Sequence, residues 1–148
     1  MPGKLPRVIP INHDDYHAKH VGRTADGRQF FLTTPFVAAT AKLHGCEFIA
    51  LYLFDATGKL LEARIDDLGP RAKLDREKAR DLYAQHLAEL GEVAYRRIKV
   101  MPFRVERFDT VFGLVPREPE EEEEDRWVTV EPGDYMAFHA PWDGDYDT

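Results

Sequence analysis

The sequence predicts an α+β fold: a mainly antiparallel sheet of hairpins, with one principal amphipathic helix (about residues 75–90) packed on one face. Two observations carry this prediction. Apolar runs of strand length are separated by Asp-Gly and Asp-Ala-Thr-Gly turns, and only one long stretch repeats its apolar residues at helical spacing. The length of 148 residues suits a single domain with one core, without internal repeats.

The N-terminal part is predicted to form a first hairpin. Residues 1–12, which hold three prolines, are expected to be an extended lead-in. Residues 16–23 and 28–34 then flank Asp26-Gly27, a pair that supplies the positive φ angles of a type I′ turn. Residues 35–45 are small and irregular, which indicates a loop or a short helix.

A second hairpin follows. Residues 46–54 are apolar on both faces, which is typical of a strand in the middle of a sheet that is covered on both sides. The turn of residues 55–58 leads into a returning strand over residues 60–66, and Gly69-Pro70 ends it.

The helix is predicted from its ends and from its apolar stripe. Asp75 is a favourable N-cap, and Gly91 stands where helices commonly stop. Six residues fall on one helical face and should pack on the sheet: Ala79, Leu82, Tyr83, His86, Leu87 and Leu90.

The remaining chain is predicted to return to strands. Residues 94–107 alternate towards strand, and Pro102 indicates a bulge or an edge. A further strand is expected over residues 111–115, then a last hairpin around the turn of residues 131–134, then a tail from 141 to 148. The simplest arrangement is one sheet with one or two helices on a face.

Negative charge is concentrated at the C-terminal end. Residues 118–148 carry 12 acidic and one basic side chain, whereas residues 1–70 are neutral and residues 71–117 carry a net charge of +4. The run from 118 to 125 should form an exposed acidic loop that either keeps the protein soluble or docks a basic segment of a partner protein. The predicted partner-binding residues are Glu120, Glu121, Glu122, Glu123, Glu124, Asp125, Trp142 and Tyr146.

A modest basic patch over residues 96–107 is interleaved with aromatic residues, as in some nucleic-acid-binding proteins. The acidic segment that follows would cancel its charge, which argues against direct nucleic-acid binding. The patch is expected instead to attract the acidic tail of the same chain or of a second copy, so self-association is an open alternative. The chain has no apolar run long enough for a membrane span, and its single cysteine can form no internal disulfide. We expect a cytoplasmic protein with no membrane contact.

Three nearby histidines form the main candidate for a metal site. His13, His17 and His20 lie close to Asp14 and Asp15, and zinc favours imidazole and carboxylate ligands. If a strand begins near residue 16, however, His17 and His20 point to opposite faces. The alternatives are a small metal-dependent enzyme that uses these histidines and a solvated entrance to the strand.

Other candidate groups have structural interpretations. Cys46 follows His44 by two residues, but it opens an apolar strand where cysteine behaves as a small hydrophobic residue. Asp66 and Asp67 should face opposite sides of their strand. His86 belongs to the apolar stripe of the helix, and residues 143–147 lack the later ligands of a calcium loop. No phosphate-binding glycine loop is present, so no cofactor is predicted.

Residues 9–17 (Ile-Pro-Ile-Asn-His-Asp-Asp-Tyr-His) and 22–31 (Gly-Arg-Thr-Ala-Asp-Gly-Arg-Gln-Phe-Phe) carry a family resemblance. They resemble the opening of bacterial proteins labelled formate hydrogenlyase regulatory protein HycA, over about the first 35 residues. The resemblance implies a regulator of transcription that acts without catalysis, for example by titrating an activator protein. It carries over no functional residues.

The sequence therefore favours a non-enzymatic binding or regulatory module that engages a protein partner through its acidic C-terminal quarter. The first alternative is an immunity or antitoxin protein that offers carboxylates to a basic toxin. The second alternative is the metal-dependent enzyme.

Overall fold

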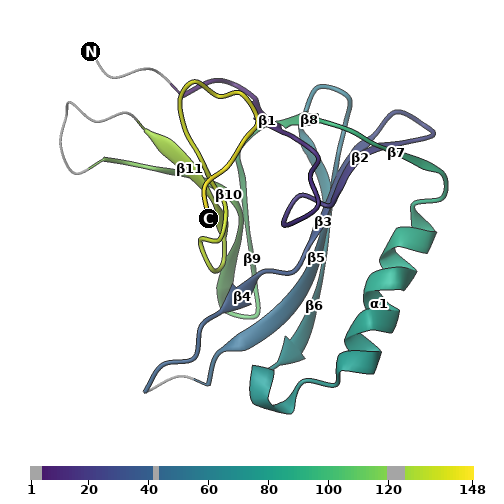
Figure 1. The fold of residues 1–148 in the computed structure, drawn as a ribbon, viewed down its shortest axis with the longest axis vertical. Helices are drawn as coiled ribbons and strands as arrows, with labels where there is room; N and C mark the ends of the chain where they lie inside the picture. Colours follow the sequence, from purple (N-terminus) through teal and green to yellow (C-terminus); the bar gives the residue numbers. More distant parts are fainter. Residues whose placement is uncertain (1–4, 42–43, 120–125) are drawn as a thin grey trace.

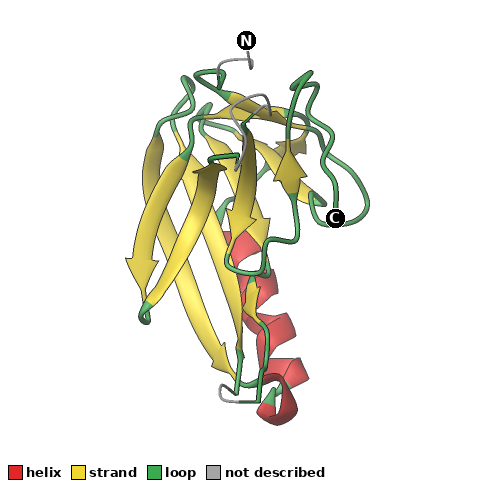
Figure 2. Cartoon of the chain, turned by 90° about the vertical axis from the view of Figure 1, so that its left-hand side faces the viewer, coloured by secondary structure: helices red, strands yellow, loops and turns green. Residues whose placement is uncertain are grey.

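The computed structural model describes residues 5–41, 44–119 and 126–148. It has three layers, with a four-stranded sheet on one side, a six-stranded sheet in the middle and helix α1 on the other side (Figure 1). Seen from the four-stranded sheet, α1 lies behind both sheets (Figure 2). All strand pairs are antiparallel, so the predicted α+β class is confirmed.

The six-stranded sheet is built around β5, which pairs along its length with β6 on one edge. Its other edge pairs first with β4 and then with β3, so that β3 and β4 act as two parts of one interrupted strand. β2 and β7 continue the sheet beyond β3. The bounds are β2 His20–Thr24, β3 Gln29–Thr33, β4 Phe36–Val37, β5 Cys46–Phe54, β6 Leu60–Gly69 and β7 Val93–Tyr95.

The first hairpin is confirmed, but two local predictions about it are wrong. Among the turn residues only Gly27 has a positive φ, of 86°, and the Gly27 amide donates to the Thr24 carbonyl at 3.1 Å. The connection is therefore a type I turn closed by a left-handed glycine, because a type I′ turn needs two positive φ angles. The strand also begins at His20, since residues 17–19 form a turn around Asp14.

The four-stranded sheet was not predicted as a separate layer. It runs in the order β12, β11, β10, β9, with bounds β9 Phe103–Arg107, β10 Thr110–Arg117, β11 Trp127–Glu131 and β12 Ala137–Phe138. A sheet that is apolar on both sides needs a cover on both sides, and the helix covers only one. The prediction of one sheet with helices on a face is therefore corrected to two packed sheets and a helix.

A short two-stranded sheet joins the N-terminal segment to the middle of the chain. β1 (Ile9–Ile11) pairs with β8 (Ile98–Val100), and Ile9 and Ile11 are fully buried. The predicted lead-in is thus partly a core strand, and residues 94–107 form parts of three strands. The side-chain amide of Gln29 ties β8 to the first hairpin, because it donates to the Lys99 carbonyl at 2.9 Å and accepts from the Lys99 amide at 2.8 Å.

The two faces of β5 supply two separate apolar layers. Phe48, Ala50, Tyr52 and Phe54 point towards the four-stranded sheet, and the alternate residues point towards α1. The inter-sheet core contains these four residues with Phe31, Phe112, Leu114, Val128, Val130 and Phe138. The helix–sheet layer contains Phe30, Leu32, Ile49, Leu51, Leu53 and Leu90, packed against Leu82, Tyr83 and Leu87.

Helix α1 (Arg76–Glu89) follows the short 3-10 turn η1 (Arg71–Lys73) and ends as predicted. The Asp75 side chain accepts a hydrogen bond from the Lys78 amide at 3.0 Å, and Gly91 adopts a φ of 73° after the last turn. No residue of α1 itself is fully buried. Within the described residues, no helix has the length and apolar character that crossing a bilayer requires.

Candidate functional site

Each N-terminal histidine contacts aromatic rings, and His13 and His20 share Tyr95 as a neighbour. His13 stacks on Tyr95 with ring centroids 5.5 Å apart, and His17 stacks on Tyr16 at 3.8 Å. His20 approaches Tyr83 of α1, with its Nδ1 2.5 Å from the hydroxyl oxygen. The described part of the chain contains no group of three His, Cys, Asp or Glu side chains placed to hold a metal ion. The candidate metal site of His13, His17 and His20 is therefore not assembled among the described residues.

The C-terminal tail closes over the loop that carries His13 and His17. The Tyr146 hydroxyl donates to Asp14 Oδ2 at 2.5 Å and accepts from the His17 amide at 3.0 Å. The same Asp14 accepts from the amides of Tyr16 and Ala18 at 2.8 and 3.0 Å. Partial burial raises the pKa of Asp14, but its hydrogen bonds outweigh burial and lower the pKa overall. Burial and the Asp14 contact raise the pKa of Tyr146 to about 12.

This closure changes the interpretation of two predicted partner-binding residues. Trp142 and Tyr146 are half-buried and pack against the inter-sheet core rather than standing free in solvent. The tail also reaches the basic stretch, because Arg97 donates to the Asp143 carbonyl at 2.9 Å and to Asn12 Oδ1 at 2.6 Å. Residues 141–148 are thus part of the folded body, and only part of each aromatic side chain remains available to a partner.

The acidic run is flanked by described residues on both sides, while residues 120–125 lie outside the described part of the chain. Arg126 Nε lies 3.3 Å from Glu118 Oε2 across it. Three other acids of the C-terminal quarter (residues 118–148) form no ion pair with a described residue: Asp134, Asp143 and Asp145. Burial, together with the nearby Glu131, raises the pKa of Asp134. Partner binding by Glu120–Glu124 and Asp125 stays a prediction.

Cys46 has a carboxylate rather than a histidine as its partner. Its thiol donates to Asp67 Oδ1 at 2.9 Å, whereas His44 is exposed. Burial and the carboxylate raise the pKa of Cys46 to about 11, so the thiol stays protonated at neutral pH. The geometry gives no support to a cysteine nucleophile.

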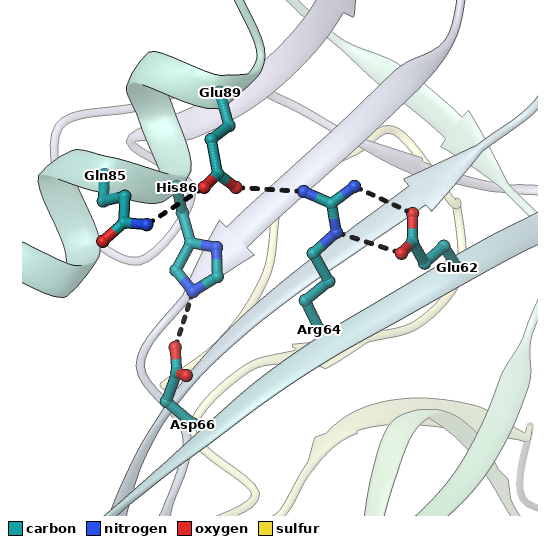
Figure 3. A network of polar contacts seen from close by, with 6 residues as sticks. All are labelled: Glu62, Arg64, Asp66, Gln85, His86 and Glu89. Carbon is teal, nitrogen blue, oxygen red and sulfur yellow. Dashed lines mark hydrogen bonds and ion pairs between the residues drawn. The ribbon is translucent and has the colours of Figure 1, made fainter.

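Asp66 and Asp67 point to opposite sides of β6, as predicted, but the partner of Asp66 could not be predicted from local sequence. Asp66 Oδ2 lies 2.5 Å from Nε2 of His86 on α1, while Nδ1 of this imidazole is buried and has no hydrogen-bond partner among the described residues (Figure 3). Beside this pair, Arg64 of β6 bridges Glu62 and Glu89. This network holds α1 against the edge strand β6. In the sequence, the feature that indicates it is a histidine among the residues of the helix that face the sheet.

Comparison with protein-family models, with curated proteins and with solved structures finds no match to this chain.

Proposed function

We propose that this protein is a non-catalytic regulatory module that binds a basic segment of a partner protein through its acidic C-terminal quarter. The observation that carries the proposal is the distribution of charge, with a net charge of −11 over residues 118–148 on a protein whose total is −7. A local field of one sign steers an oppositely charged partner more effectively than the same charge spread over the surface.

The described strands of this quarter support the proposal. β11 and β12 belong to the four-stranded sheet, on the side of the molecule opposite α1 (Figure 1). Positive charge is sparse within the quarter, whose only basic residue is Arg126. These two strands therefore lie on the other side of the protein from the arginines around the start of α1. The resemblance of the first 35 residues to proteins labelled HycA implies the same regulatory class.

The test immobilises the full chain and two charge-neutralised variants as baits in a native cell lysate. The proteins that each bait captures are identified by mass spectrometry. The first variant replaces Glu120–Glu124 by glutamine. The matched control removes five negative charges elsewhere through D15N, E77Q, D81N, E92Q and D109N. None of these five control side chains forms an ion pair with a described residue.

We expect a defined basic partner to bind the wild type and the control but not the first variant. Binding should weaken between about 50 mM and about 500 mM salt, because exposed charges are screened over a few ångströms at high ionic strength. Equal capture by all three baits, or capture that salt does not change, would contradict the proposal.

A further inference from the structure

A pocket of about 480 Å³ lies between α1 and the outer face of the six-stranded sheet. This volume is within the range of about 300–1,000 Å³ that is common for sites of small organic ligands. The pocket is lined by the start of β5, the end of β6, the segment around η1 and one face of α1. It exists because a single helix covers only part of a wide sheet.

The walls of the pocket are mainly apolar. Ile49 of β5 and Leu68 of β6 come from the sheet, and Leu74 lies just before the helix. α1 adds Ala84 and Leu87. Ile49 is almost fully buried, whereas Ala84 is exposed, so the pocket extends from the helix–sheet layer to the protein surface. Such a surface favours a hydrocarbon or aromatic group over water.

The polar groups of His20 and Tyr83 satisfy each other at the pocket wall. Their hydrogen bond is 2.5 Å long, and Tyr83 also lies 3.4 Å from the Leu32 carbonyl. Burial, and then the charges of Lys19 and His13, lower the pKa of His20, so the imidazole is neutral at neutral pH. This part of the pocket therefore carries no charge of its own.

The charge that remains at the pocket is positive. Arg76 and Arg80 line it one helical turn apart, and neither forms an ion pair with a described residue. Arg71 also lines the pocket, but it is paired with Glu47 at 3.1 Å, and Glu47 is the only acid in the lining. Two guanidinium groups are thus available beside an apolar cavity, and guanidinium binds carboxylate in a planar two-bond geometry.

We propose that this pocket binds a small organic carboxylate with an apolar body. The carboxylate is held by Arg76 and Arg80 on the first turns of α1, and the apolar body lies against Ile49, Leu68, Leu74 and Leu87. This ligand site is separate from the acidic C-terminal quarter, and its existence does not depend on the proposed protein partner.

The test uses the fluorescent anion 8-anilinonaphthalene-1-sulfonate as a reporter on the full-length chain, with dodecanoate and dodecylamine as competitors. We expect the reporter to bind saturably and dodecanoate to displace it. Dodecylamine should displace the reporter at least about tenfold less effectively, because the arginines repel its positive charge. Equal competition by the amine and the acid would overturn the assignment of the ligand class.

Two variants locate the binding. A84W places an indole in the pocket from an exposed position and should abolish displacement by dodecanoate, while circular dichroism and the melting temperature stay those of the wild type. R76Q/R80Q should weaken the binding of dodecanoate by about tenfold, which corresponds to about one charge-assisted hydrogen bond. The control R104Q/R107Q removes the same charge from β9 and should leave the affinity unchanged. Unchanged dodecanoate binding in folded A84W, or an equal loss in the control, would overturn the proposed site.

Discussion

The two apolar layers of this protein differ in how completely they are closed. The inter-sheet core is rich in aromatic side chains that meet edge to face, such as Phe48 and Phe112 with ring centroids 4.8 Å apart, and these residues are almost fully buried. In the helix–sheet layer the strand residues are buried, but no residue of α1 is, and a pocket remains beside the helix. The comparison indicates that the two sheets supply most of the stability, while the helix leaves space for a ligand.

The largest effect should come from opening the inter-sheet core. Phe112→Ala removes a fully buried ring and should lower the free energy of unfolding by about 3–5 kcal/mol. Leu87→Ala in α1 removes a half-buried side chain and should cost about 1 kcal/mol. Urea unfolding of both variants gives the two values, and equal losses would show that the layers contribute alike.

A second test removes the Asp66–His86 hydrogen bond that joins the helix to β6. Asp66→Ala removes the hydrogen bond between Asp66 and His86, whose side chain is only 12% exposed, and should lower the free energy of unfolding by about 1–3 kcal/mol. Glu62→Ala in the neighbouring exposed network is the control and should cost less than about 1 kcal/mol. If the two substitutions have the same effect on urea unfolding, the Asp66–His86 contact does not hold the helix.

The N-cap of α1 offers a smaller perturbation. Asp75→Ala removes the acceptor of the Lys78 amide and should destabilise the protein by about 1 kcal/mol. Hydrogen exchange should become faster in α1 while β5 stays protected, because the loss is local to the helix. Asp81→Ala, on the exposed side of the same helix, should change neither measurement. Faster exchange throughout both sheets would show that the helix and the sheets unfold as one unit.

The smallest expected effect separates His20, which lies beside helix α1, from His139, which follows β12. Burial lowers the pKa of His20 below its usual 6.5, whereas hydrogen bonds to Asp147 and then to the Ala140 carbonyl raise the pKa of His139 above it. The contribution of His20 to stability is therefore complete above pH 6.5 and is lost as the pH falls below it. The contribution of His139 is complete below pH 6.5 and is lost as the pH rises through its raised pKa. An NMR titration should show His139 protonating first as the pH falls, and the reverse order would contradict both assignments.

Local signals were enough to predict the hairpins and the helix. Asp75 and Gly91 mark the ends of α1, and the turns of residues 24–28 and 55–59 place glycine where the backbone needs a positive φ. The apolar character of both faces of residues 46–54 also indicated a strand covered on both sides, as β5 is.

What the sequence did not reveal depends on pairing between distant segments. The pairing of Ile9 with Val100 makes a strand out of the predicted lead-in, and β7 joins the six-stranded sheet through β2. No local pattern marks such partners, so the second sheet and the division of residues 94–107 were missed. The pocket was missed for the same reason. From the sequence alone, Arg76 and Arg80 are expected to be ordinary exposed helix residues, and only the packing of the sheet against the helix shows that they line a cavity.

The hydrogen bonds from Tyr146 to the Asp14 loop have a consequence for how the protein is made. Hairpins can form as soon as their strands leave the ribosome, but the loop around Asp14 and His17 cannot reach its final arrangement until residue 146 has been synthesised. We expect the N-terminal loop to be the last region to gain protection from hydrogen exchange when ribosome-bound chains of increasing length are compared. During synthesis, His13 and His17 would therefore be open to chaperones and proteases for longer than any residue of the β5–β6 hairpin.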